Sequence, residues 1–228
     1  MCIRDSLAAA PVLHRGSTSQ GFVEYAQMGG LTISQVSIMV LVRQEIREET
    51  GLERVETRTF DVRLNRTAPD SPWRFERLAS AGGTPVPRPE TLSPAAIAVL
   101  DDPRIAIADS ARWDIYSGHT QDSMLTLMSA LADVSPYAAV VLHTGHPINV
   151  FQTDRLSNHS VGRAIDIYRV GEQNVIDGRD EGSMVWNFVQ ALTGRADIVE
   201  FGTPWPLEGT PRMFTNLVHQ DHLHIASF

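Results

Sequence analysis

The chain has 228 residues, of which 43% are hydrophobic and 20% are charged, a composition typical of a globular protein with one well-buried domain. Its formal net charge of −8 argues against nucleic acid as a partner, because phosphate binding depends on clustered lysine and arginine. The only cysteine, Cys2, excludes an intrachain disulfide and leaves the redox compartment undecided.

The first thirty residues carry little periodic pattern. Residues 1–6 resemble a translated sequencing adapter, and we interpret them as an artefact that hides the natural beginning of the chain. No basic start followed by an apolar core is visible, so there is no recognisable signal peptide. Residues 7–30 are small, polar and dotted with glycine, and we expect residues 1–30 to be poorly ordered. Their deletion is therefore expected to leave a soluble, metal-binding protein.

Residues 31–89 are expected to form an N-terminal helix and strand followed by a linker. The apolar run over 31–42 is shorter than the ~20 residues that span a bilayer, so we expect no transmembrane segment. It is predicted to continue into a helix that ends at Gly51. Residues 55–66 alternate apolar and polar side chains, which predicts a strand. Prolines within residues 85–89 make a stiff loop, where we place the domain boundary.

The expected N-terminal helix raises an alternative function. Gly29 and Gly30, followed by residues 45–52, resemble the Nudix box of diphosphate hydrolases, in which glutamates on one helical face hold magnesium. Two positions depart from that motif, because Val36 replaces a glutamate and Gln44 replaces an arginine. Glutamate-rich helix ends are common on solvated surfaces, so we interpret the run as a plain surface helix.

Residues 90–228 are expected to form the main domain, with an α+β fold in which helices flank a small antiparallel sheet. Ser93 and Pro94 are typical of a helix beginning, at the N-cap and the first turn. Hydrophobic periodicity predicts the elements of this domain in the following order: a helix over 92–100, a helix over 123–134, strands over 137–142 and 163–170, a helix over 184–192, and strands over 198–201 and 223–228.

Residues 157–166 and the histidine-rich run at 219–224 carry the strongest chemical signal. Zinc accepts imidazole nitrogen and carboxylate oxygen, and a catalytic zinc site keeps three protein ligands with a fourth position open for water. On a strand, His222 and His224 project to the same face, so both can lie beside one metal. The two runs together predict a metal site.

The first run is similar to a motif of the zinc D-alanyl-D-alanine carboxypeptidases and murein endopeptidases, which share a fold with the hedgehog signalling domain. The five fixed positions of that motif are present here as Ser157, His159, Gly162, Ala164 and Asp166. A late His-x-His pair completes the resemblance. What it implies is a site in which His159, Asp166 and His224 are the ligands of Zn²⁺.

The resemblance also implies roles for the neighbouring histidines. His222 is expected beside the metal without necessarily binding it. Many members of the family have a glutamate base shortly before the His-x-His pair, whereas this chain has His219 there, a variation also found among the murein endopeptidases. We expect His219 and His222 to be the catalytic residues that accept or return a proton.

Four residues are candidates for substrate binding: His146, Ser157, Arg163 and Trp205. In the resembling family an arginine after the preceding strand faces the substrate carboxylate, whereas this chain has His146 in that region. Arg155 and Arg163 are the available cations, and the sequence assigns neither. Turn formation is the alternative for His146, and packing of a loop is the alternative for Trp205.

These observations predict zinc-dependent hydrolysis of peptidoglycan stem or cross-bridge peptides, outside the cytoplasm in the cell envelope or beyond it. The alternative is a catalytically silent zinc module that binds wall peptide or a protein partner, because hedgehog-type relatives show that the ligand set alone does not guarantee hydrolysis. The sequence does not indicate an oligomeric state, nor does it distinguish an endopeptidase from a carboxypeptidase.

Overall fold

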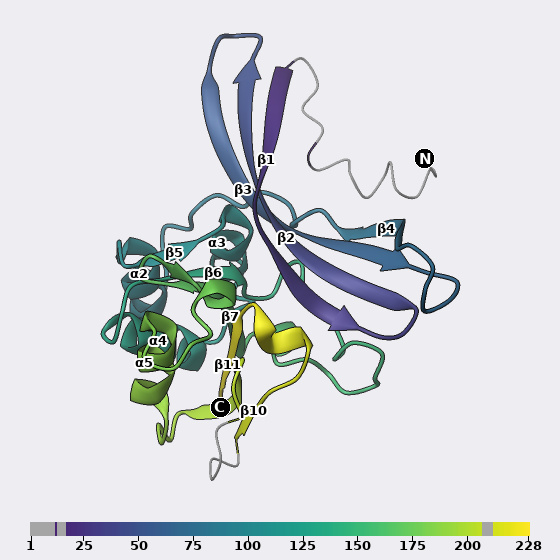
Figure 1. The fold of residues 1–228 in the computed structure, drawn as a ribbon. Coiled ribbons are helices and arrows are strands. Elements are labelled where there is room, and N and C mark those ends of the chain that lie inside the picture. Colours follow the sequence, from purple (N-terminus) through teal and green to yellow (C-terminus); the bar gives the residue numbers. More distant parts are fainter. Residues whose placement is uncertain (1–11, 13–16, 207–211) are drawn as a thin grey trace.

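The computed structural model describes residues 12, 17–206 and 212–228 of the chain. These residues contain four α helices and two β sheets, one of them antiparallel and the other mixed. Three long strands cross the body of the molecule and extend beyond it in Figure 1, while the helices gather on the other side of the body. The described residues therefore form a mixed α/β fold. The expectation for residues 1–6 lies outside them.

The N-terminal sheet is an antiparallel meander of four strands, joined in chain order by short connections. Its strands are β1 (Ser17–Leu31), β2 (Gln35–Glu48), β3 (Glu53–Asn65) and β4 (Arg74–Ser80). The strand predicted over residues 55–66 is confirmed as β3. Two other expectations are wrong, namely the disorder of residues 17–30 and the helix ending at Gly51.

The composition of β2 explains why this run is a strand. Val36, Ile38, Val40 and Val42 place β-branched side chains at alternate positions, a pattern that suits a pleated strand better than a helix. The intervening Met39 and its neighbours on the same face are buried against the body. Both faces of this run carry apolar side chains, although only one face is fully buried, so the sequence does not alternate and its periodicity alone does not separate a strand from a helix.

This strand also removes the basis of the Nudix resemblance. Glu45 and Glu48 lie three residues apart on β2, so strand geometry directs their side chains to opposite faces of the sheet. The single helical face of glutamates that would hold magnesium is therefore not formed.

The second sheet has seven strands and lies in the body of the molecule. Its order is β10-β9-β11-β7-β6-β5, and β8 pairs with the C-terminal end of β7. The strands are β5 (Ile105–Ile107), β6 (Tyr137–Val141), β7 (Ala164–Val170), β8 (Gln173–Asn174), β9 (Ile198–Gly202), β10 (Met213–Phe214) and β11 (Leu223–Ser227). The expected antiparallel arrangement holds only in part, because the β5–β6 and β9–β10 pairs are parallel.

The helices bury apolar faces against this mixed sheet and one another. They are α2 (Pro94–Asp101), α3 (Asp109–Tyr116), α4 (Asp122–Ala132) and α5 (Met184–Leu192), with 3₁₀ turns η2 (His159–Val161), η3 (Val175–Asp177) and η4 (Val218–Gln220). The Ser93 hydroxyl accepts a hydrogen bond from the Ala96 amide at 3.2 Å, which confirms the predicted cap of α2. Within the described residues, no helix combines the length and apolarity needed to cross a membrane.

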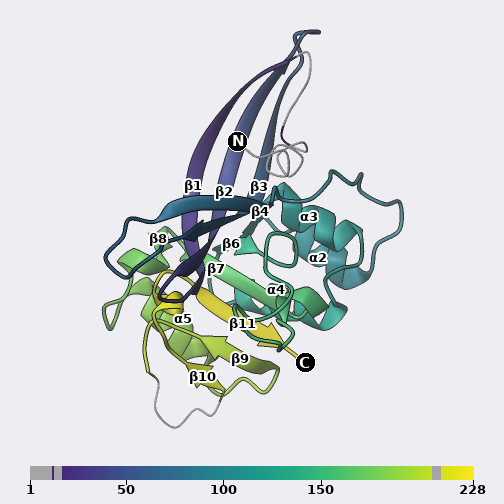
Figure 2. The same ribbon diagram turned by 90° about the vertical axis from the view of Figure 1, so that its right-hand side faces the viewer.

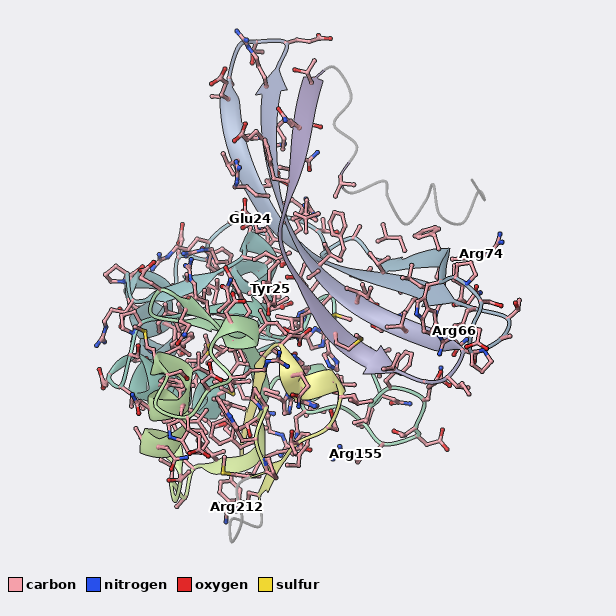
Figure 3. The ribbon with its side chains drawn as sticks, viewed as in Figure 1. Glu24, Tyr25, Arg66, Arg74, Arg155 and Arg212 are labelled. Carbon is pink, nitrogen blue, oxygen red and sulfur yellow. The ribbon has the colours of Figure 1, made fainter. Side chains whose placement is uncertain are left out.

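The N-terminal sheet packs directly on the mixed sheet, as Figure 2 shows from the side. Met39 of β2 is buried against Val140 and Val141 of β6. Tyr25 of β1 stacks on Tyr168 of β7 with ring centroids 4.5 Å apart, and Figure 3 places Tyr25 where β1 crosses the body. The proline-rich loop thus separates two sheets along the chain that share one buried interface in space.

Candidate metal centre

Three chain segments bring the predicted ligands together. Asp166 on β7 and His224 on β11 are register partners in adjacent antiparallel strands, so their side chains lie side by side on one face of the sheet. His159 comes from the η2 turn, which Gly162 closes in a left-handed conformation with φ of +72°. A Cβ atom at Gly162 would lie 2.1 Å from the His119 carbonyl oxygen, so only glycine fits there.

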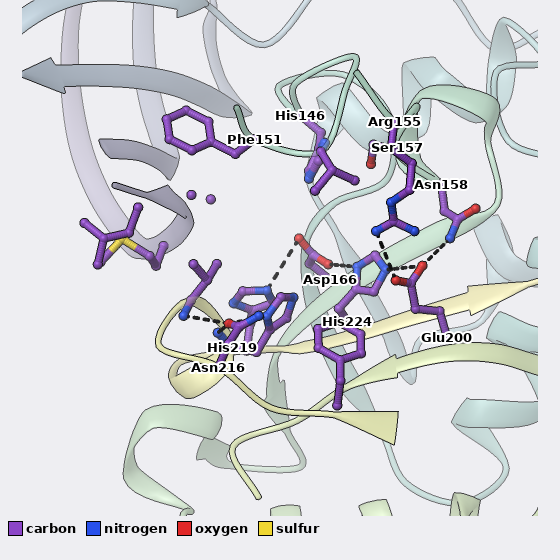
Figure 4. Close-up of a pocket in the computed structure, with 18 residues that line it drawn as sticks. His146, Phe151, Arg155, Ser157, Asn158, Asp166, Glu200, Asn216, His219 and His224 are labelled. Atoms are coloured by element: carbon purple, nitrogen blue, oxygen red, sulfur yellow. Dashed lines mark hydrogen bonds and ion pairs between the residues drawn. The ribbon is translucent and has the colours of Figure 1, made fainter. Parts of the chain in front are cut away.

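The candidate ligand atoms form a small triangle. His159 Nε2 lies 3.0 Å from Asp166 Oδ1 and 3.2 Å from His224 Nδ1, and these last two atoms are 2.9 Å apart. Tetrahedral zinc with bonds of ~2.0–2.1 Å holds its ligand atoms ~3.3 Å apart. The three side chains, at most 11% exposed, therefore need to move very little to accept the ion. Figure 4 shows two of them, Asp166 and His224, beside each other at the cavity.

The surroundings fix the orientation of these ligands. His159 Nδ1 hydrogen bonds to the Leu142 carbonyl, so this nitrogen carries the proton and Nε2 keeps its lone pair toward the triangle. Asp166 Oδ2 accepts a hydrogen bond of 2.6 Å from the Gln27 amide. Glu200 lies on the far side of His224, with Oε2 4.0 Å from His224 Nε2. Partners of this kind hold metal ligands in place before the metal arrives.

Charge at the site favours the ionised form of Asp166. Burial by itself would raise the pKa of this carboxyl, but its electrostatic interactions with the His159 and His222 imidazoles and its hydrogen bonds with His159 and His224 outweigh that effect. The pKa is held well below its usual range. Asp166 is therefore a carboxylate at neutral pH, which is the form that binds a metal.

His146 is a further candidate ligand beside the triangle. Its ring stacks on that of His159, with centroids 4.1 Å apart, and its Nδ1 hydrogen bonds to the Pro147 carbonyl at 2.8 Å. Together with His159 and Asp166 it offers ligand atoms within 4.8 Å of one another. Burial, then the electrostatic effect of the nearby His159 imidazole, lowers the pKa of His146 well below its ordinary value, so the ring is neutral.

The remaining histidines differ in their partners. His222 Nδ1 lies 2.7 Å from Asp221 Oδ1, while its Nε2 faces Asp166 Oδ2 at 3.9 Å. The carboxylate of Asp221 thus accepts the proton of Nδ1 and turns Nε2, as a proton acceptor, toward the triangle. The Met28 amide of β1 holds the other Asp221 oxygen at 2.8 Å. An aspartate–histidine dyad therefore stands beside the ligands.

His219 has a weaker claim to proton transfer. Its Nδ1 hydrogen bonds to Asn216 Oδ1 at 2.8 Å, and its ring lies edge-on to Phe214. Burial above all, followed by the electrostatic effect of the nearby His222 and His224 imidazoles, lowers the pKa of His219 to about 2. This imidazole is neutral at every ordinary working pH and is a poor base.

A cavity of about 480 Å³ opens beside the triangle. Its lining includes residues 28–31 of β1, the loop that carries Phe151 and Arg155, and the C-terminal histidines. His146 and Ser157, both expected at the substrate, belong to this lining. The Ser157 hydroxyl also accepts a hydrogen bond of 3.2 Å from the backbone amide of His159.

Arg163 and Trp205 lie outside that lining, contrary to expectation. Arg163 reaches the side-chain oxygen of Asn158 at 3.4 Å. Trp205 donates its ring N–H to the Arg179 carbonyl at 2.8 Å and meets Trp186 edge-on at 5.1 Å, so it anchors a loop. Among the described residues that line the cavity, the only guanidinium belongs to Arg155, which pairs with Glu200 at 3.4 Å.

Sequence reasoning missed Gln27, Asp221 and Glu200 as partners of the site. Gln27 lies 139 positions from Asp166 in the chain, in a strand that was expected to be disordered. Asp221 lay within the histidine-rich run, and its position directly before His222 was the one available signal.

No protein-family model matches this chain, and neither a curated protein nor a solved structure matches it.

Proposed function

We propose that this protein is a zinc-dependent hydrolase of peptidoglycan stem or cross-bridge peptides. The observation that carries the proposal is the triangle of His159, Asp166 and His224, with ligand atoms 2.9–3.2 Å apart. Its edges match a tetrahedral zinc site, and its open side faces the cavity. The resemblance of residues 157–166 to the zinc peptidases supplies the substrate class.

The side chains around the triangle have separable tasks in this proposal. Zinc held by His159, Asp166 and His224 would supply a Lewis acid and would lower the pKa of a water molecule toward ~7. His222 receives the proton of the attacking water at Nε2 and later donates it to the leaving amine. Asp221 keeps the His222 ring in the required tautomer, as its 2.7 Å contact with Nδ1 allows.

Arg155 is the residue that we assign to a carboxylate of the stem peptide. Its guanidinium borders the cavity, and its side chain is 63% exposed, so it can turn from Glu200 toward a ligand. The neighbouring β1 segment also borders the cavity, where the Phe151 side chain packs so closely on Gly30 that a Cβ atom at Gly30 would lie 2.2 Å from it.

A muropeptide digest analysed by mass spectrometry tests the proposed function. The zinc-loaded full chain should convert cross-linked muropeptides into monomers, or pentapeptide stems into tetrapeptides, and either product identifies the bond that is cut. The chelated protein and the His224→Ala variant are the matched controls and should leave the profile unchanged. An unchanged profile with wild-type protein that demonstrably holds zinc would contradict hydrolysis.

The second candidate is a silent zinc module that binds wall peptide. It is favoured by the replacement of the usual glutamate with His219, whose pKa of about 2 makes it a poor base. In this case zinc-loaded protein should bind a stem peptide in calorimetry without cleaving it. The His222→Ala variant should then bind the peptide as well as the wild type.

A further inference from the structure

A second group of potential ligands lies outside the cavity. Asp114 on α3, His119 after that helix and His143 after β6 offer ligand atoms within 4.8 Å of one another. Asp114 Oδ1 lies 3.7 Å from His119 Nδ1 and 3.9 Å from His143 Nδ1. The two imidazole rings face each other with centroids 4.9 Å apart.

Asp114 is a buried carboxylate without a strongly basic partner. Its side chain is 2% exposed, and within the part of the chain that the structure describes its ion-pair partners are His119 and His143 alone. The amide and hydroxyl of Thr144 and the His143 amide donate hydrogen bonds to it. A buried charge is costly unless a positive group compensates it, and neutral donors compensate it only in part.

His143 supplies an independent observation. Its Nδ1, the atom that faces Asp114, is buried and has no hydrogen-bond partner among the described residues. Buried polar atoms are rarely left unpaired, so this nitrogen calls for a partner.

We propose that Asp114, His119 and His143 form a second metal-binding site, for zinc or a similar first-row divalent cation. Two imidazole nitrogens and one carboxylate oxygen suit zinc better than calcium or magnesium, which prefer oxygen ligands. The distances of 3.7 and 3.9 Å exceed the ~3.3 Å of a tetrahedral zinc site by about half an ångström. Small rotations of His119 and His143, whose side chains are 52% and 33% exposed, would close both gaps.

Such an ion would brace the turn that carries His159. The Gln121 amide donates a hydrogen bond of 2.9 Å to the Gly162 carbonyl, so the segment after His119 lies against that turn. His143 directly follows Leu142, whose carbonyl orients the His159 ring. The second site therefore ties together both supports of His159, which predicts a structural role. It does not depend on the proposed hydrolysis.

Zinc counting in paired variants tests the second site. Untagged full chain is stripped with a chelator, dialysed against a low-micromolar excess of free zinc, and analysed for metal and protein. Wild type should hold about two zinc ions per chain, and His224→Ala about one. His119→Phe keeps an aromatic ring against His143 but no ligand nitrogen, and it should also hold about one. The double variant should hold none, and His119→Cys should regain the second ion.

The second site would be overturned by a His119→Phe variant whose zinc count equals that of the wild type. Far-UV circular dichroism of each variant verifies folding, and His119 is exposed enough for its replacement to be tolerated. If His224→Ala instead keeps the full count while His119→Phe loses one ion, the first centre fails and the second stands. Failure of muropeptide cleavage alters none of these counts, so the two proposals are separable.

Discussion

The two histidine–aspartate clusters offer the same kinds of ligand atom, yet the protein has organised them to different degrees. In the cluster of His159, Asp166 and His224 the ligand atoms are 2.9–3.2 Å apart and the side chains are buried. In the second cluster the corresponding distances from Asp114 are 3.7 and 3.9 Å, and both histidines are partly exposed.

The difference comes from the supporting contacts. The first cluster draws partners from the N-terminal sheet and from the end of β6, which fix a ring tautomer and a carboxylate oxygen before metal binds. The second cluster leaves one histidine nitrogen without a partner and another in contact with solvent. Because a preorganised site spends less free energy on ordering its ligands, we expect the first cluster to bind zinc more tightly than the second.

Removal of β1 should have the largest effect on folding and zinc binding, and the first cluster should be affected more than the second. Deleting residues 1–31 uncovers the β2 edge and removes Gln27 and the Met28 amide from the centre. In contrast to the expectation from the sequence, we now expect loss of soluble folded protein, or of tight zinc binding in what remains, measured by circular dichroism and metal analysis. A deletion of residues 1–11, which leaves β1 whole, is the matched control. A truncated protein with normal folding and zinc affinity would show that the N-terminal sheet is dispensable.

His222→Ala should separate metal binding from turnover at the first cluster. Zinc content should stay at the wild-type value, while the muropeptide cleavage rate should fall ~10²–10⁴-fold, the usual value of general acid–base help. Asp221→Asn removes the orienting carboxylate and should cause a smaller fall. Loss of zinc in His222→Ala would make His222 a ligand, and unchanged cleavage would place the proton acceptor elsewhere.

Gln27→Ala should weaken the first cluster and leave the second untouched. It removes the 2.6 Å hydrogen bond to Asp166 Oδ2, and loss of such a supporting partner commonly lowers metal affinity ~10–100-fold. Competition with a chromophoric chelator measures the change. Gln20→Ala, at an exposed position of the same strand, is the control. Equal affinities in the two variants would mean that the contact does not support the ligand.

Ser93→Ala should have the smallest effect and should spare both clusters. It removes the cap of α2 and its hydrogen bond to Asp122, which predicts a loss of ~1 kcal/mol in the free energy of unfolding. For a chain of this size the melting temperature should fall by about 2–4 °C in calorimetry. Ser129→Ala inside α4 removes the same hydroxyl without a cap and should change it less. A change in zinc content would show that α2 is coupled to a metal site and would contradict this prediction.

Local sequence patterns correctly predicted three of the helices and one buried strand. Caps and 3.6-residue periodicity located α2, α4 and α5, and the apolar run of β6 was recognisable because both its faces are buried. The three residues of the first cluster were found because strand alternation and a specific motif point to the same side chains. The structure brings these three together, although metal binding itself stays a prediction.

Long-range contacts explain what sequence reasoning missed. β1 and β2 pair over their whole lengths, and a single strand of mixed composition gives little sign of the partner that orders it. No local pattern marks Gln27 as a partner of the site, because only the tertiary packing of β1 brings its side chain to Asp166 on β7. The second cluster joins Asp114 to His143 across the connection that contains α4, and no local spacing marks those residues as neighbours.

Anomalous diffraction at the zinc absorption edge, from crystals of the zinc-loaded full chain, tests the central claim most directly. We predict a strong peak beside the triangle, ~2.0–2.1 Å from His159 Nε2, Asp166 Oδ1 and His224 Nδ1, with its fourth position open to the cavity. A zinc-loaded crystal with no peak there, or with a peak held by His146 or His222 in place of His224, would contradict the ligand assignment and the hydrolase mechanism built on it.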